Sequence, residues 1–295
     1  MLTLTRRSRA ARLWAALAAL VVVPATLAVS TGSAVAAGSN TLTIKAGEYT
    51  YQLSGSPKAG WTQINFDNAG VENHMVVGFH LKKGTTPAQL KKALSSQDQD
   101  ALTKIAASGG DPTVSGLPAL VGPGQKTTAL TELTAGTYGI ACFVTAPDGS
   151  PHAAHGMYKV FTVTGKSNLK PPTDGVAEVA LNDTSITVPP GNAPKNLTVK
   201  VSNAGTAAHS FQLVKINDGK TLADAYTYFN ALFASGKADG EAPGVLVGGV
   251  SAVAPGGIAY VEWSLPAGNY GYVSTDGDTP NDDYSKGLQG TFTIG

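Results

Sequence analysis

Short runs in which apolar and polar residues alternate recur along most of the chain, and glycine, proline or asparagine interrupts them at short intervals. Successive side chains of a strand point to opposite faces of a sheet, so this two-residue period predicts strands with one buried face. In the first half of the chain it predicts strands at residues 41–46, 49–53, 61–66, 75–81, 126–133, 137–144 and 158–163. Many short strands separated by turns indicate a mainly β protein, a sandwich or a barrel.

One segment of the first half departs from this alternation. Between residues 85 and 109, Leu90, Leu94 and Leu102 follow the spacing of one helical face. Thr86 is a suitable N-cap in front of Pro87, and two glycines end the run. We expect one or two helices inserted between strands.

The second half of the chain repeats motifs of the first half in the same order. Asn68-Ala69-Gly70, followed by His74, recurs as Asn203-Ala204-Gly205, followed by His209, at an offset of 135 residues (209 − 74). Later motifs recur at an offset of 132 residues (274 − 142), and a second helical pattern starts at Thr221. This order indicates a tandem duplication of one β-sandwich, with a short helical insertion in each copy.

The boundaries of the copies follow from a polar segment that contains two prolines. We expect one domain at residues 41–165, a linker at 166–174 and a second domain at 175–295. Such a linker predicts that the domains unfold separately unless their interface is large.

The first 37 residues have the character of a secretory signal peptide. Arg6, Arg7, Arg9 and Arg12 precede an apolar run, and Ala34-Val35-Ala36 offers a cleavage site. We therefore expect a protein exported to the cell envelope or beyond, by the general or the twin-arginine route. No later apolar run predicts a membrane span. The balance of 21 basic and 20 acidic residues gives no indication of nucleic-acid binding.

The candidate chemistry gathers near the end of the first copy. The single cysteine, Cys142, is followed by His152, His155 and Met157 within fifteen residues. Thiolate, imidazole and thioether are the soft ligands that copper prefers, and His74 is the candidate for a further imidazole. An unpaired cysteine in an exported protein is itself unusual. The copper hypothesis therefore places the metal on His74, Cys142, His152 and Met157.

The second copy serves as an internal comparison for these four residues. In it, Ser274 takes the position of Cys142, Asp283 that of His152 and Leu288 that of Met157. Only His74 has a histidine counterpart, His209. We infer that folding does not require the three other residues and that the second copy has no copper site.

With these residues in place, the first copy resembles the cupredoxins, the Greek-key β-sandwich proteins that carry type 1 copper. The resemblance implies one type 1 copper held by His74, Cys142, His152 and Met157. Nine residues lie between Cys142 and His152, and four between His152 and Met157, which is similar to the type 1 loop of copper nitrite reductases. For the second copy the resemblance extends to the fold alone.

The resemblance also implies a function. The chain lacks the His-x-His pairs of multicopper oxidases, and Ala141 stands where nitrite reductases have the histidine that connects to a second copper. We therefore expect electron transfer to or from a redox partner protein rather than enzymatic activity. By the same resemblance, an exposed edge of His152 would be the electron port, with Pro151, Ala153 and Ala154 around it.

Several alternatives stay open at this level. Cys142 could be a buried hydrophobic residue, His155 could compete with His152 for the metal, and His80 is expected to lie outside the site. The protein could also be a metal-free binding module of the cell envelope, or could store and deliver copper.

Overall fold

The computed structural model describes residues 40–95, 100–108, 112–235, 237–277 and 282–295. The predicted signal peptide lies outside these residues. Within the described ranges, no helix combines the length and the apolar character needed to cross a membrane.

The N-terminal half, residues 40–165, contains every strand that the alternating pattern predicts, with bounds that differ by a few residues. Its strands are β1 (Thr41–Gly47), β2 (Thr50–Ser54), β3 (Gly60–Asn68), β4 (Val77–Leu81), β5 (Leu117–Pro118), β6 (Lys126–Leu133), β7 (Gly136–Ala141) and β8 (Tyr158–Val163). In β1, Leu42, Ile44 and Ala46 are buried while the residues between them are not, as the pattern requires. The pattern missed β5, which has only two residues.

The C-terminal half, residues 175–295, has the same order of elements. Its strands are β9 (Val176–Asn182), β10 (Ser185–Thr187), β11 (Asn196–Asn203), β12 (His209–Ile216), β13 (Gly244–Val253), β14 (Ile258–Ser264), β15 (Gly268–Val273) and β16 (Gln289–Ile294). Parallel β1–β3 pairing in the first half corresponds to parallel β9–β11 pairing in the second. The fold is mainly β, with two sandwich-like halves that repeat one order of strands, as the sequence predicts.

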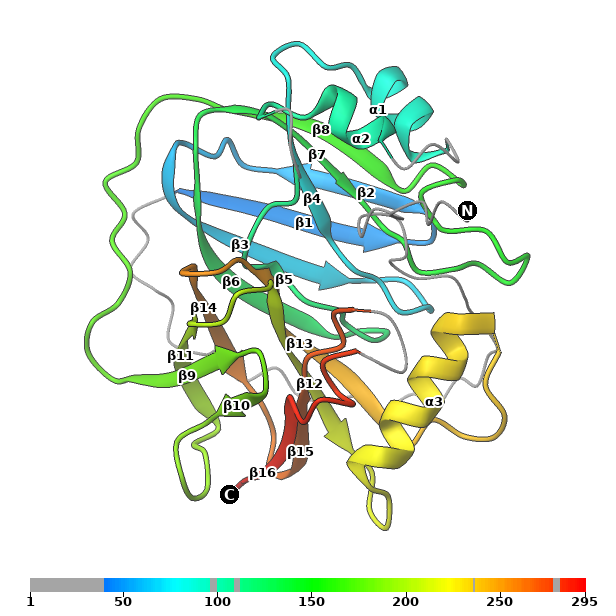
Figure 1. Cartoon of the computed structure of the whole chain (residues 1–295), viewed down its shortest axis with the longest axis vertical. Helices are drawn as coiled ribbons and strands as arrows, with labels where there is room; N and C mark the ends of the chain where they lie inside the picture. The colour runs from blue at the N-terminus through cyan, green and yellow to red at the C-terminus, as the bar shows by residue number, and fades with distance from the viewer. Residues whose placement is uncertain (1–39, 96–99, 109–111, 236, 278–281) are drawn as a thin grey trace, which may run out of the picture.

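Helices occur where the sequence predicts insertions. In the N-terminal half α1 (Pro87–Leu94) and α2 (Ala101–Ile105) lie above the strands (Figure 1). The Thr86 side chain accepts a hydrogen bond from the Gln89 backbone, and the Gln89 side-chain oxygen accepts one from the Thr86 backbone, so the predicted N-cap is part of a complete capping box. In the C-terminal half α3 (Leu222–Ser235) follows Thr221, whose hydroxyl accepts a hydrogen bond from the Asp224 backbone.

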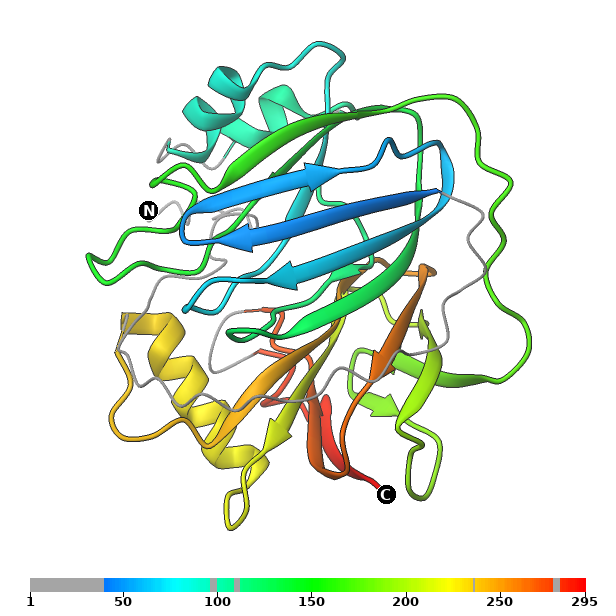
Figure 2. The same cartoon turned by 180° about the vertical axis from the view of Figure 1, so that it is seen from behind.

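The two halves share a sheet, because β6 pairs antiparallel with β14. This pairing joins four strands of each half into one eight-stranded sheet, in the order β10-β9-β11-β14-β6-β3-β1-β2. The second sheet of the C-terminal half, β16-β15-β12-β13, is likewise extended by β5 of the N-terminal half. Figures 1 and 2 show β6 and β14 side by side from both sides of the molecule.

Both pairings join equivalent positions of the two halves. Ala129 of β6 faces Val261 of β14, and Pro118 of β5 faces Val250 of β13. The residues of each pair are 132 positions apart (261 − 129 and 250 − 118), which is the offset of the sequence motifs. The halves therefore meet as two subunits do across a two-fold axis. Because the halves share two sheets, we expect them to unfold together rather than separately.

Candidate metal centre

A short turn after β3 positions His74. The Asn68 side-chain amide donates to the backbone carbonyls of Glu72 (2.7 Å) and Val121 (3.0 Å), and its oxygen accepts from the Gly70 backbone. His74 and Val121 exchange two backbone hydrogen bonds of 3.0 Å. These contacts fix the His74 backbone before β4 begins. The His74 side chain is completely buried.

The loop between β7 and β8 holds the other candidates, and hydrogen bonds across the loop fix its shape. The Cys142 backbone N–H donates to the Met157 carbonyl (3.0 Å), and the Met157 N–H donates to the His152 carbonyl (3.0 Å). Near its tip, Asp148 accepts a hydrogen bond from the Ser150 backbone and Gly149 has a φ of 85°, so Asp148-Gly149 makes a turn. The loop thus returns His152 toward Cys142.

Three of the four predicted ligands converge on one point. Cys142 Sγ lies 4.0 Å from His74 Nδ1 and 3.5 Å from His152 Nδ1, and the two Nδ1 atoms are 3.2 Å apart. All three side chains are fully buried. Met157 is also fully buried and belongs to the same hydrophobic cluster as Cys142. Its role as an axial ligand stays a prediction.

The surroundings of Cys142 oppose ionisation of the free thiol. Burial raises its pKa to about 12, although backbone N–H groups of Met75 and Val144 and the Tyr51 hydroxyl act in the opposite direction. Without a bound cation the group is therefore a neutral thiol at neutral pH. A metal would have to displace that proton to bind sulfur as a thiolate.

Carboxylates face the outward nitrogen of each imidazole. His74 Nε2 lies 3.6 Å from Glu48 Oε1, and His152 Nε2 lies 2.8 Å from Glu72 Oε2. Neither contact is a hydrogen bond, so both Nε2 atoms and Glu72 Oε2 are buried without a hydrogen-bond partner. The His74 imidazole lowers the pKa of Glu48 to about 2, against the effect of its partial burial. Burial lowers the pKa of His152.

Sequence reasoning missed both carboxylates, although the repeat contains a signal for one of them. Glu48 precedes His74 by 26 residues (74 − 48), and Asp183 precedes His209 by the same distance (209 − 183). In the structure Asp183 Oδ1 lies 3.0 Å from His209 Nε2. A Cβ atom on Gly70 would lie 2.1 Å from Glu48 Oε1 and 2.7 Å from His74 Nε2, so the glycine makes room for this contact.

The equivalent point in the C-terminal half is a closed hydrogen-bond cluster. Asp283 Oδ2 accepts from the Ser274 hydroxyl (2.7 Å) and lies 2.6 Å from His209 Nδ1. The Ser274 and Leu288 backbones are linked as those of Cys142 and Met157 are, which confirms the alignment of the two copies. Carboxylates there occupy both nitrogens of His209, whereas the N-terminal cluster leaves buried polar atoms unpaired.

The two remaining histidines of the N-terminal half lie outside the cluster, as expected. His155 is exposed, contacts Ser150 (2.8 Å) and stacks on Tyr49 with ring centroids 4.7 Å apart. His80 stacks on Tyr138 at 4.7 Å.

The predicted electron port is wrong in one respect, because His152 has no exposed edge. Its side chain is fully buried. Tyr49 covers it edge-on with ring centroids 4.9 Å apart, and Glu72 lies against its outward nitrogen. The sequence around His152 did not show this, because the covering residues come from the β1–β2 turn and the segment before His74.

Comparison with solved structures returns copper proteins with a low level of similarity. A multicopper oxidase is 14% identical over 86% of this chain and 88% of its own, with a TM-score of 0.25. Auracyanin A, a blue copper protein from Chloroflexus aurantiacus, is 16% identical over 41% of this chain and 98% of its own (TM-score 0.28). A copper-containing nitrite reductase from Thermus scotoductus is 12% identical over 86% of this chain and 61% of its own (TM-score 0.25).

No protein-family model and no curated sequence matches the chain. The similarities to solved structures are too low to carry an argument about function. The structure itself defines a mainly β protein with two sandwich-like halves. Its N-terminal half contains a buried His-Cys-His cluster of His74, Cys142 and His152.

Proposed function

We propose that the chain is an exported electron-transfer protein that holds one type 1 copper in its N-terminal half. The ligands are His74, Cys142 and His152, with Met157 as a weak axial ligand. One observation carries the proposal: two imidazole Nδ1 atoms and one thiol converge within 4.0 Å in a site closed to water. Export rests on the predicted signal peptide in the first 37 residues.

The carboxylates explain why this cluster suits a cation. The negative charge of a carboxylate within 3.6 Å of each Nε2 favours the tautomer that carries its proton on Nε2, and this leaves the lone pair of Nδ1 free. With both imidazoles in that tautomer, two lone pairs point at each other across 3.2 Å. A cation between them converts this repulsion into two bonds. In the C-terminal half, a carboxylate oxygen of Asp283 faces His209 Nδ1, so no two imidazole lone pairs oppose each other there.

The donor set favours copper over other cations. Two imidazoles, one cysteine sulfur and a distant thioether match the blue-copper arrangement, whereas structural zinc takes four strong ligands. When bound, copper would supply a one-electron couple between Cu(II) and Cu(I). The chain's contribution is a preformed, water-free site whose ligands are held by the Asn68 turn and the cross-loop hydrogen bonds. Within the described residues, the proposal of one copper rests on the cluster of His74, Cys142 and His152.

A visible absorption spectrum tests the proposal most directly. The purified protein with one equivalent of Cu(II) should develop an intense blue or green band from the bond between copper and the Cys142 sulfur. Cys142→Ser should lose this band. His155→Ala changes a histidine of the same loop outside the cluster, so it should keep the band. A wild-type protein that stays colourless with Cu(II) contradicts the proposal.

A metal-free envelope binding module is the second candidate, and the C-terminal half supports it. That half keeps the same fold with Ser274, Asp283 and Leu288 in place of ligands, so the scaffold does not need a metal. Metal analysis of the protein purified from its native compartment separates the two candidates. One copper per chain supports electron transfer, and no bound metal supports the binding module.

A further inference from the structure

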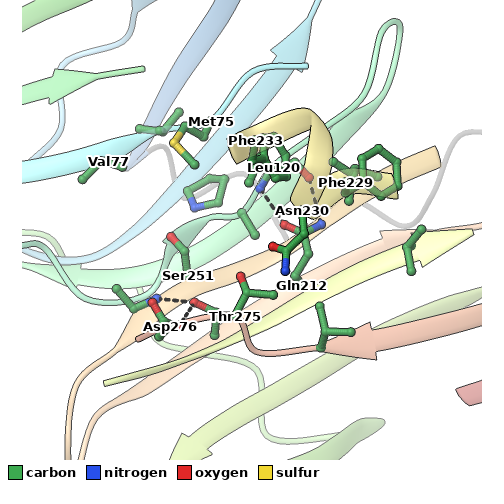
Figure 3. Close-up of a pocket in the computed structure, with 18 of the residues that line it drawn as sticks. Met75, Val77, Leu120, Gln212, Phe229, Asn230, Phe233, Ser251, Thr275 and Asp276 are labelled. Atoms are coloured by element: carbon green, nitrogen blue, oxygen red, sulfur yellow. Dashed lines mark hydrogen bonds between the residues drawn. The ribbon is translucent and has the colours of Figure 1, made fainter. Parts of the chain in front are cut away.

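A cavity lies where the two halves meet, beside α3. Its volume is about 120 Å³, and both halves contribute to its wall. Figure 3 shows Met75, Val77 and Leu120 of the N-terminal half on one side and Phe229 and Phe233 of α3 on another. The cavity exists only because the halves are packed together, so neither half contains it alone.

Two polar side chains, Thr275 and Asp276, line one side of this apolar cavity (Figure 3). The Ser210 hydroxyl donates to Asp276 Oδ2 at 2.6 Å, which fixes the carboxyl group. Within the part of the chain that the structure describes, Asp276 Oδ1 and the Thr275 hydroxyl have no hydrogen-bond partner. Both groups are therefore available to a ligand.

The other central polar side chain of the wall, Gln212, is not available. Its oxygen accepts from the Leu120 backbone (2.9 Å), and its nitrogen donates to the carbonyls of Leu120 (3.0 Å) and Gly248 (3.0 Å). Gln212 thus links the two halves by hydrogen bonds, and both its oxygen and its nitrogen already have partners. Thr275 and Asp276, beside Asn230 and Ser251 of the same wall, therefore offer polar contacts to a ligand (Figure 3).

We propose that this cavity binds a small uncharged alcohol with an apolar ring, whose hydroxyl group lies against Thr275 and Asp276. The volume sets the size, because an apolar cavity of about 150 Å³ is known to accept benzene. The phenylalanines provide the apolar wall for the ring. The hydroxyl can donate to the free carboxyl oxygen and accept from the threonine.

Charge selects against an anionic ligand. Burial raises the pKa of Asp276, and the nearby Asp283 adds to this effect. The surroundings of Asp276 therefore disfavour its negative charge. A carboxylate on the ligand would bring a second negative charge next to Asp276. The proposal goes beyond the copper site and does not depend on it, since none of the three converging ligands lines the cavity.

The two methionines of the described chain make a direct test possible in the metal-free full-length protein. Met75 lines the cavity, and Met157 lies in the candidate metal centre. With ¹³C-labelled methionine methyl groups, benzyl alcohol should shift the Met75 signal in a saturable way and leave the Met157 signal in place. No saturable shift of Met75 at millimolar benzyl alcohol overturns the proposal, as does an equal shift of both signals.

Matched ligands and variants test the hydroxyl contact. Toluene lacks the hydroxyl and benzoate carries a charge, so both should bind more weakly than benzyl alcohol. Thr275→Val should weaken benzyl alcohol roughly five-fold, the effect of one hydrogen bond, and leave toluene unchanged. Thr187→Val, on the outer strand β10, is the control. Equal affinities for toluene and benzyl alcohol overturn the assignment.

A filling variant tests the location by a second route. Ala225 of α3 lines the cavity, so Ala225→Leu should abolish the binding of benzyl alcohol. If this variant does not fold, Asp276→Asn in its place should weaken benzyl alcohol and relieve the exclusion of benzoate. Unchanged binding of both ligands in the folded variant overturns the proposal.

Discussion

At the scale of single residues, the candidate metal centre and its counterpart differ in how buried polar atoms are satisfied. Asp283 takes the place of His152 and closes the C-terminal cluster with hydrogen bonds. In the N-terminal half, Glu72 lies 2.8 Å from His152 Nε2 without a hydrogen bond. A buried polar group without a hydrogen-bond partner costs about 1–3 kcal/mol, so the outward side of the N-terminal cluster is less well satisfied than that of its C-terminal counterpart.

Glu72→Gln tests whether this carboxylate orients His152 for the metal. An amide cannot replace the negative charge, so copper affinity should fall by about 10- to 100-fold, the usual effect of losing a partner behind a metal-bound histidine. Competition with a chelator measures the change. Glu241→Gln removes an exposed glutamate of the C-terminal half and should leave affinity unchanged. Equal affinities of the two variants would show that Glu72 has no such role.

Met157→Leu tests the axial position. Leu288 occupies the equivalent position of the C-terminal half and is fully buried, so leucine fits this fold. The variant should keep copper, because the axial bond is weak, and its reduction potential should rise because a donor is lost. Redox titration of the absorption band measures the potential. An unchanged potential would mean that the Met157 sulfur does not act on the metal.

At the scale of strands and helices, the sequence predicts those features that depend on local patterns. The strands of the N-terminal half other than β5 follow from alternation, and the Thr86 N-cap follows from capping chemistry. Strand β5 escaped prediction because it has two residues and its partner, β13, lies in the other half. No local pattern contains that information.

The candidate metal centre likewise combines residues that a local pattern predicts with residues that contacts between distant segments bring in. Residue types within one loop, together with the resemblance to cupredoxins, selected Cys142 and His152. The positions of Glu48 and Glu72, and the burial of His152 beneath Tyr49, depend on how distant turns pack against that loop. Only the offset shared by Glu48 and Asp183 could have indicated one of them in advance.

Glu262 of β14 gives a prediction for the seam between the halves, where it faces Thr128 of β6. Burial raises the pKa of Glu262 above its ordinary value of 4.5. The folded state therefore favours the neutral form, and Glu262 lowers stability as pH rises through its folded pKa. Glu262→Gln should increase the free energy of unfolding at pH 7.5, and this gain should vanish near pH 4.

Urea denaturation at the two pH values measures the effect. Glu132→Gln, an exposed glutamate of β6, is the control and should be nearly neutral at both. A loss of stability in Glu262→Gln at pH 7.5 would contradict the explanation by burial.

At the scale of the whole molecule, the shared sheet and a common core join the two halves. One hydrophobic cluster contains Leu120 and Val121 of the N-terminal half together with Val214 and Leu246 of the C-terminal half. A perturbation of one half is therefore transmitted to the other through packed side chains. The linker at residues 166–174 is a poor guide to this behaviour.

Copper should accordingly stabilise the whole chain in a single transition. A ligand that binds only the folded state adds about 4 kcal/mol at a thousandfold excess over its Kd. Calorimetry with and without Cu(II) should show one unfolding peak that moves as a unit. Two unfolding peaks, one of which keeps its temperature when Cu(II) is added, would show that the halves unfold separately despite the shared sheet.

The pairing of Ala129 with Val261 also has a consequence for a chain cut between its halves. Because the two positions are equivalent, the β6 edge is complementary to the same edge of a second copy. The connecting segment then acts as a tether that keeps two self-complementary units at a high local concentration. Released from that tether, a fragment of residues 41–165 should form a homodimer through β6.

Sedimentation of the fragment at several concentrations measures this association. Ala129→Pro removes a backbone donor from the β6 edge and should leave the fragment monomeric. A fragment that is monomeric without this change would show that the edge needs the sequence of β14. A dimer that dissociates on dilution would show that the present molecule is the covalently joined form of such a pair.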